Sequence, residues 1–276
     1  MNLLLKNHQS IGDVIMLTAC VRDIKRWYPE INIMVDTSAN VLFENNPYIS
    51  KVFPIGEEVI DIQMEYPLIH KVGDQDVHFL YGFIDFINKK LSLRVKLTEF
   101  KGDLHLTADE KKDNPPEPYW VMLAGGKGDF TAKHWWKEAW QTVVDKSKVH
   151  FVTIGGKEHE QHHSKLTGVT DMVGKTSIRE ALKLIYHSSG VISPVTFAMH
   201  TAAIFDKPCV CIAGGREHWW WEKYPGHHHI HTMGALDCCK SGGCWKSHCS
   251  NKNDKGQQKC LALINPGQIA EIINNA

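Results

Sequence analysis

One segment in the second half of the chain constrains the fold more than any other. Residues 191–203 (VISPVTFAMHTAA) predict a short buried strand, a tight loop and a helix of small residues. Residues 207–215 (KPCVCIAGG) predict a second buried strand that ends in glycines. In an open α/β sheet, ligands bind beyond the carboxyl ends of the strands, and helix N-termini there attract phosphate. The segment therefore predicts a site for a phosphate-bearing ligand. The alternative is an ordinary β-α-β packing unit without a ligand.

Length and charge narrow the class of protein. The chain has 276 residues, which is enough for two domains that each have a core. Its formal net charge is zero, so no overall field recruits nucleic acid or an anionic membrane. No apolar run reaches membrane-spanning length, and the apolar stretch at residues 1–6 is too short for a signal peptide. We expect a cytoplasmic protein without a transmembrane segment.

Strand and helix patterns alternate along both halves of the chain. The strands expected in the first half cover residues 3–5, 31–35 and 52–54, and the helices cover 14–27 and 78–93. Residues 57–76 are hard to assign. In the second half we expect further strands at 120–123 and 149–154, and helices at 137–145, 177–186 and 266–274. The charged, proline-rich stretch 109–118 is the best domain boundary, so we expect α/β domains at 1–112 and 113–276.

Five of the eight cysteines crowd into one polar segment, residues 238–260, near the C-terminus. In a reducing compartment such clustering favours a metal or a functional thiol over structural disulfides. Cys239, Cys244, Cys249 and Cys260 could form a structural zinc site, although their spacing is not the usual Cys-x₂-Cys. Free thiols or disulfides are the alternative.

Four separated motifs together resemble glycosyltransferase family 9, the ADP-heptose:lipopolysaccharide heptosyltransferase family. The motifs are residues 11–13 (IGD), 133–135 (KHW), 155–160 (GGKEHE) with 174–177 (GKTS), and 196–203 (TFAMHTAA) with 214–215 (GG). Their order and spacing match over most of the chain, and weakly between about residues 55 and 110. The resemblance implies the GT-B fold, in which two Rossmann-like parallel-sheet domains face a cleft. A Cys-rich C-terminal segment and a terminal helix would complete the second domain.

The first motif contains the candidate catalytic base. Asp13 follows Gly12 just after the first expected strand, at the start of a helix whose dipole favours a carboxylate. The resemblance implies that Asp13 removes a proton from the acceptor hydroxyl. The alternative is that Asp13 only caps the helix, since Asp is a favoured N-cap residue.

The second motif contains the candidate phosphate-binding cation. The resemblance implies that Lys133 binds the donor diphosphate, and lysine supplies a mobile positive charge suited to a departing phosphate. Gly125 and Gly126 precede it and permit a close approach of the backbone. Lys127 is a second candidate for the same role.

The third motif is expected to hold the nucleoside. The resemblance implies that Glu160 binds the ribose hydroxyls, with Glu158 as the alternative if the register is shifted. Thr176 and Ser177 would contact the base through their backbone groups. Ser177 could equally be a helix cap.

The fourth motif both keeps and departs from the family pattern Asp-Ser/Thr-Gly-x-x-His. Thr196 and His200 are kept, and they would contact the diphosphate; His200 could also be a buried helix histidine. Val195 stands where an aspartate usually contacts the donor sugar, and Phe197 stands where a glycine lets the backbone reach phosphate. Because valine accepts no hydrogen bond, the resemblance does not establish heptose as the sugar.

Residues 217–231 have no counterpart in these motifs. Their tryptophans could stack on a base or a sugar, although covering the core is the more usual role. Consecutive histidines do not share one face, so we expect the histidine run to bind metal only adventitiously.

The motifs together predict an inverting glycosyltransferase that moves a sugar from a nucleotide-diphosphate sugar to a hydroxyl acceptor. The acceptor would be a glycan, a lipopolysaccharide-type or another lipid-linked sugar, bound by residues 1–112, and no cofactor would be required. One alternative is a phage-type enzyme that glycosylates a hydroxymethylated base in DNA, suggested by the basic Cys-rich segment. A sugar-nucleotide-binding module without catalysis is the other.

Overall fold

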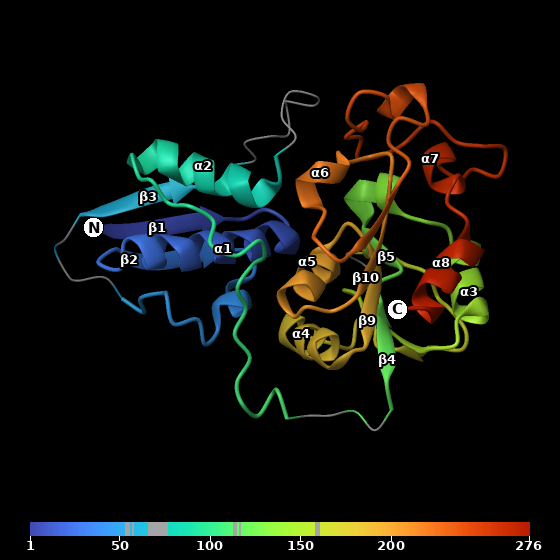
Figure 1. The fold of residues 1–276 in the computed structure, drawn as a ribbon, viewed down its shortest axis with the longest axis horizontal. Coiled ribbons are helices and arrows are strands. Elements are labelled where there is room, and N and C mark those ends of the chain that lie inside the picture. Colours follow the sequence, from blue (N-terminus) through green and yellow to red (C-terminus); the bar gives the residue numbers. More distant parts are fainter. Residues whose placement is uncertain (53–55, 57, 66–76, 113–114, 116, 158–160) are drawn as a thin grey trace.

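The computed structural model describes residues 1–52, 56, 58–65, 77–112, 115, 117–157 and 161–276 (Figure 1). It is an α/β protein built on two parallel sheets that lie side by side, with the helices between and around them. The expected fold class, two Rossmann-like parallel-sheet units of the GT-B type, is confirmed.

The smaller sheet is formed by the first part of the chain. Its strands are β1 (Asn2–Asn7), β2 (Asn32–Thr37) and β3 (Val59–Gln63), in the order β2-β1-β3 and all parallel. Its helices are α1 (Ile11–Trp27) and α2 (Phe79–Leu91), with a 3₁₀ helix η1 at Asn40–Phe43. The strand expected at 52–54 falls mostly outside the described residues, of which only Val52 belongs to it and lies in an exposed bend. The third described strand, β3, lies in the stretch 57–76 that the sequence left unassigned.

The larger sheet has six parallel strands in the order β11-β10-β9-β4-β6-β8. These strands are β4 (Tyr119–Met122), β6 (His150–Thr153), β8 (Thr170–Asp171), β9 (Gly190–Pro194), β10 (Cys209–Gly214) and β11 (His228–His231). Its helices are α3 (Lys137–Lys146), α4 (Ile178–His187), α5 (Phe197–Ile204), α6 (Trp219–Glu222), α7 (Lys259–Ala262) and α8 (Pro266–Asn274). This part of the chain also contains two 3₁₀ helices, η2 (Gly128–Lys133) and η3 (Asp237–Cys239). A separate antiparallel pair is formed by β5 (Gly125–Lys127) and β7 (Gln161–His163).

One apolar core runs through both sheets. Its buried residues extend from Leu3 on β1 through α1 and α5 to Val191 on β9. Successive side chains of a strand point to opposite faces, so Ile192 belongs to a second core between the large sheet and helices α3 and α8. The two sheets therefore do not form separate cores, because α1 packs directly on α5.

Helix α1 is buried around its whole circumference. Every residue from 13 to 24 is buried. A helix buried on all sides is normally apolar throughout, but this one also contains charged residues. Two of these residues, Arg22 and Asp23, are 1% and 0% exposed and form an ion pair. A buried charge is tolerated only when it is paired and hydrogen-bonded, so the surroundings of this pair explain its presence.

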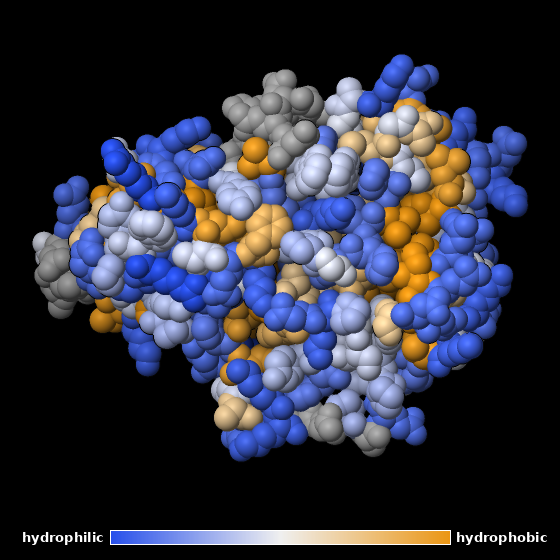
Figure 2. Space-filling view, viewed as in Figure 1, coloured by the Kyte–Doolittle hydropathy of each residue, from blue (hydrophilic) through white to orange (hydrophobic). Residues whose placement is uncertain are grey.

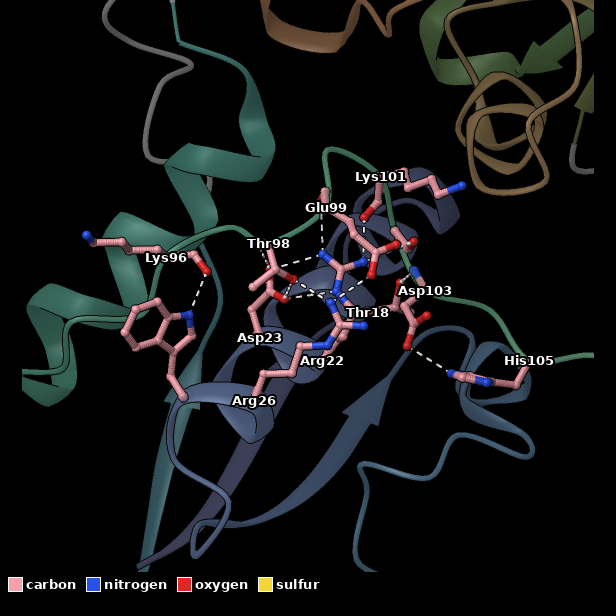
Figure 3. Close-up of polar contacts among 12 residues, drawn as sticks. Thr18, Arg22, Asp23, Arg26, Lys96, Thr98, Glu99, Lys101, Asp103 and His105 are labelled. Atoms are coloured by element: carbon pink, nitrogen blue, oxygen red, sulfur yellow. Dashed lines mark hydrogen bonds and ion pairs between the residues drawn. The ribbon is translucent and has the colours of Figure 1, made fainter.

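The segment after α2 supplies the missing partners of that pair (Figure 3). Arg22 donates to the backbone oxygens of Glu99 and Lys101, both at 2.9 Å. Asp23 accepts from the backbone N–H of Thr98 at 3.1 Å and from its hydroxyl at 2.5 Å. Residues 98–101, which belong to the connection between the two sheets, are thus hydrogen-bonded to α1 at Arg22 and Asp23. The connection then reaches the turn after α5, where Lys101 Nζ lies 2.7 Å from a carboxylate oxygen of Asp206.

Polar side chains cover most of the face shown in Figure 2, with hydrophobic residues in a patch beside α7 and α8 and in smaller groups over the other half of the molecule. None of the helices among the described residues has the length and apolar character needed to cross a bilayer.

We predict that Asp23→Ala lowers the free energy of unfolding by about 3–5 kcal/mol, since it leaves the Arg22 charge buried and unpaired. The matched control is Arg26→Ala, whose partner Glu99 is exposed. That change should cost no more than about 1 kcal/mol. Urea unfolding of the two variants measures both values, and equal small losses would contradict the account of the buried pair.

Candidate functional site

A cleft of about 490 Å³ opens between the N-terminus of α1 and the carboxyl ends of the strands of the large sheet. It brings together nearly all the candidate residues predicted from the sequence. Those that line it are Gly12, Asp13, Gly125, Gly126, Lys127, Lys133, Thr176, Ser177, Thr196, Phe197 and His200. Glu160 and its alternative Glu158 lie outside the described residues.

Asp13 lies in the first turn of α1 rather than in a loop before it. The helix begins at Ile11, three residues earlier than predicted, with Ser10 as its N-cap. Oδ2 of Asp13 accepts a hydrogen bond from the backbone N–H of Ser10 at 2.9 Å. The carboxylate therefore caps the helix and lines the cleft at once, so the two interpretations of Asp13 are compatible.

Gly12 brings the two halves of the cleft into contact. A Cβ atom at Gly12 would lie 3.0 Å from Cδ2 and 3.2 Å from Nε2 of His200 on α5. The His200 ring is held from its other side, because Nδ1 lies 2.8 Å from the hydroxyl of Tyr224. Burial, with further positive groups nearby, lowers the pKa of His200 well below its usual value, so the ring is neutral. The N-termini of α1 and α5 thus meet at one cleft, where their dipoles favour an anion.

Lys133 is held by an anionic partner that the sequence analysis did not identify. Its Nζ lies 2.6 Å from Oε1 of Glu217 and donates to the backbone oxygen of Val195 at 3.2 Å. The same Oε1 also accepts from Arg216. Burial of Glu217 opposes its ionisation, but the charges of Lys133 and Arg216 outweigh burial, so its pKa is lowered and it is a carboxylate.

Glu222 is the second acidic residue missed by the sequence analysis. It lines the cleft from α6, and it is 7% exposed. Burial and the neighbouring carboxylate of Glu217 raise the pKa of Glu222 well above its usual value. The cleft therefore contains one ionised glutamate and one that holds a proton. Both lie in residues 217–231, where the unusual sequence signal is the run of tryptophans and histidines and two glutamates form no recognisable motif.

The Cys-rich segment forms part of the cleft wall. Trp245 and Ser247 line the cleft, and the Arg216 guanidinium lies 4.4 Å from the centroid of the Trp245 ring. The backbone N–H of Ala132 donates to Ser247 O at 3.0 Å. The segment crosses Arg216 at Gly243, which has a φ of 95° and where a Cβ would lie 2.5 Å from Arg216 O. Residues 238–260 are therefore built into the site.

The cysteines of this segment gather near Gly215. The side chains of Cys239 and Cys260 pack on Gly215, and the backbone N–H of Cys244 donates to Gly215 O at 3.2 Å. Cys249 donates instead to the backbone oxygen of Asn251. Within the described ranges, no group of three or more His, Cys, Asp or Glu side chains is placed to hold a metal ion. The structural zinc site stays a prediction that this geometry does not support.

The remaining predicted residues have clear local roles. Ser177 is the N-cap of α4, and its hydroxyl accepts from Glu180 N at 3.2 Å, so the helix-cap alternative holds for it. Thr196 is the N-cap residue of α5, and its hydroxyl has no hydrogen-bond partner among the residues described. Lys127 reaches across the cleft, where its Nζ lies 3.4 Å from the hydroxyl of Ser10.

A second cavity, of about 600 Å³, lies between α2 and α6. Aromatic side chains dominate its lining, with one acid and one base at its edge: Val77, His78, Tyr81, Asp85, Phe100, Trp220, Lys223, Tyr224 and Pro225. His78 and Phe79 are neighbours in the chain, and Phe79 lines the first cleft, so α2 separates the two spaces.

Comparison with known proteins identifies one family. The model of glycosyltransferase family 9 (heptosyltransferase) matches residues 78–253. No curated protein matches the chain.

Several solved structures share the fold. The family 9 glycosyl transferase from Veillonella parvula DSM 2008 is 12% identical, with a TM-score of 0.70 over 99% of this chain and 97% of that one. The iron-containing dodecameric glycosyltransferase TibC from enterotoxigenic E. coli H10407 is 17% identical, with a TM-score of 0.70 over 99% of this chain and 75% of its own. E. coli heptosyltransferase WaaC with ADP-2-deoxy-2-fluoro heptose is 14% identical, with a TM-score of 0.63 and 100% of both chains covered.

We predict that Gly12→Ala lowers the free energy of unfolding by about 1–3 kcal/mol, because the added methyl group overlaps the fixed ring of His200. Alanine is otherwise the better helix residue by roughly 0.5–1 kcal/mol. In a His200→Ala background the same change should therefore become stabilising. Urea unfolding of the wild type, the two single variants and the double variant measures this difference. If Gly12→Ala changes the free energy of unfolding equally with and without His200, the contact is not the cause.

Proposed function

The chain belongs to glycosyltransferase family 9, and from that premise we propose that it transfers a sugar from a nucleoside-diphosphate sugar to a hydroxyl acceptor with inversion at the anomeric carbon. One observation carries the proposal. Asp13 from the small-sheet side, and Lys133 with the N-terminus of α5 from the large-sheet side, line the same cleft. A base and a leaving-group site facing each other are what a single displacement requires.

The donor would be held by residues 113–276. Its nucleoside would lie near Thr176 and Ser177, and its diphosphate beside Lys133 and the N-terminus of α5, where Thr196 and His200 lie. Lys133 would leave Glu217 to reach the phosphates. Glu217 would keep Arg216 as a partner, so this movement would not leave a buried carboxylate unpaired.

The transfer step follows from these positions. The acceptor oxygen attacks the anomeric carbon as Asp13 takes the proton from that oxygen. The bond between the anomeric carbon and the diphosphate oxygen breaks, and the diphosphate leaves with the electron pair. Lys133 and the helix dipole of α5 stabilise its developing charge. A single displacement from the opposite face inverts the anomeric configuration.

The acceptor would lie on the side of residues 1–112, against α1 and α2, where Phe79 lines the cleft. We propose a glycan or a lipid-linked sugar of lipopolysaccharide type. Transfer to a hydroxymethylated base in DNA is the alternative substrate class, and it would be accompanied by salt-sensitive binding of duplex DNA.

A thermal-shift screen across ADP-, UDP-, GDP- and CMP-sugars tests the donor. Binding at a hundred times the dissociation constant contributes about 2.7 kcal/mol, so we expect the correct donor to raise the melting temperature by roughly 5 °C. Lys133→Met should abolish that shift. Lys137→Met, at the exposed start of α3, is the matched control and should retain it. Absence of a shift with all four donor classes would refute the proposal. A shift without transfer to any acceptor would indicate a binding module.

A further inference from the structure

Glu222 is a buried carboxyl that the transfer step described above does not use. It belongs to the short helix α6, which follows β10, and it lines the same cleft as Asp13 and Lys133. Side chains of glutamate are almost never this buried unless other groups satisfy them.

The neighbouring acid Glu217 is paired with cations, whereas Glu222 shares a hydrogen bond with Glu217 and keeps one oxygen without a partner. Glu217 has two cationic partners, Lys133 and Arg216. The contact of Glu222 Oε1 with Nε2 of His200 is 3.8 Å, too long for a hydrogen bond. Oε2 of Glu222 is shielded from solvent and accepts no hydrogen bond from any residue that the structure describes. A buried acceptor without a partner is costly and calls for an explanation such as a bound ligand.

The strand order indicates which part of a donor would reach Glu222. Thr176 and Ser177 follow β8 at one edge of the large sheet, α5 follows β9, and Glu222 follows β10. In the sheet, β8 and β9 are separated by β6 and β4, and β10 comes next after β9. A nucleoside beside Thr176 and a diphosphate at the N-terminus of α5 would therefore place the sugar over β10. Asp13 is at this end as well, because its neighbour Gly12 approaches His200, whose Nε2 lies 3.8 Å from Oε1 of Glu222.

The two glutamates, Glu217 and Glu222, favour a neutral hydroxyl over a phosphate group as the ligand at Glu222. The carboxylate of Glu217 repels a phosphate placed beside Glu222, and a nearby aspartate adds to that repulsion. A sugar hydroxyl carries no charge and both donates and accepts hydrogen bonds. Val195, which lies at the carboxyl end of β9, offers only an apolar side chain there.

We propose that Glu222 binds a hydroxyl of the transferred sugar through Oε2 and so makes the enzyme select donors that carry a hydroxyl at that position. This inference rests on the proposed function. It assigns α6 to recognition of the donor sugar, while Lys133 and α5 serve the diphosphate. Removing Glu222 should therefore weaken binding of the sugar nucleotide but not of the nucleotide alone.

Calorimetric titrations with three matched pairs test this: ADP and ADP-glucose, UDP and UDP-glucose, GDP and GDP-mannose. The pair that binds the wild type most tightly is then titrated into the variants. We expect Glu222→Ala to weaken the sugar nucleotide roughly tenfold, as expected for one lost hydrogen bond, and to leave the nucleoside diphosphate unchanged. Glu222→Gln keeps a neutral group with an acceptor oxygen, so it should stay within about threefold of wild type for both ligands. Glu138→Ala, on the exposed surface of α3, is the control for loss of a glutamate.

Equal weakening of both ligands by Glu222→Ala would overturn the proposal, because it would place Glu222 at the diphosphate or in the fold. Unchanged affinity for both would overturn it too. If the alanine variant does not fold, Glu222→Asp, which withdraws the carboxyl by one methylene, must show the same difference between the two ligands. If the wild type binds none of the six ligands, the proposed function is refuted, and this inference with it.

Discussion

The approach of Gly12 to the ring of His200 is the constraint on which the site depends. It allows the first turn of α1 to touch α5, so Asp13 on α1 and the N-terminus of α5, the proposed base and the proposed phosphate-binding helix, share one cleft. A side chain at position 12 would separate them. The contact is held from both sides, because Tyr224 fixes the ring and the continuous core beneath α1 and α5 fixes the helices. The buried pair of Arg22 and Asp23 secures the far end of α1 to the connection between the sheets.

The charges of the cleft show how an apolar interior accommodates a polar reaction. Lys133 and Arg216 both pair with Glu217, so Glu217 keeps one cationic partner if Lys133 binds a phosphate group as we propose. Burial and the charge of Glu217 raise the pKa of Glu222, which favours its neutral form. The cleft then does not contain a second buried negative charge beside Glu217. His200 is neutral for the corresponding reason, since burial lowers its pKa. In the proposed function, the positive charge of Lys133 serves the diphosphate and the neutral polar groups serve the sugar.

Much of this architecture was predictable from local patterns. The terminal helix was placed at 266–274, where it is observed, because Pro266 marks its first turn and apolar residues recur at helical spacing. The strand β3 was missed because its side chains are mostly exposed and its alternation is weak. Helix α1 was started too late because Gly12 suggested a loop, although Ser10 and Asp13 have the spacing of a capping pair. The roles of Glu222 and Trp245 arise only from tertiary packing, so no local pattern in the sequence could reveal them.

The most direct test of the account is the rate of sugar transfer by Asp13→Asn. Asparagine has nearly the same shape and can still accept the Ser10 hydrogen bond through its side-chain oxygen, but it cannot take up the acceptor proton. With the donor found for the wild type, calorimetry should show unchanged donor affinity. Single-turnover transfer should fall by roughly 10²–10⁴-fold. Transfer at the wild-type rate by this variant would contradict the assignment of Asp13 as the base and, with it, the account of how the two halves of the cleft act together.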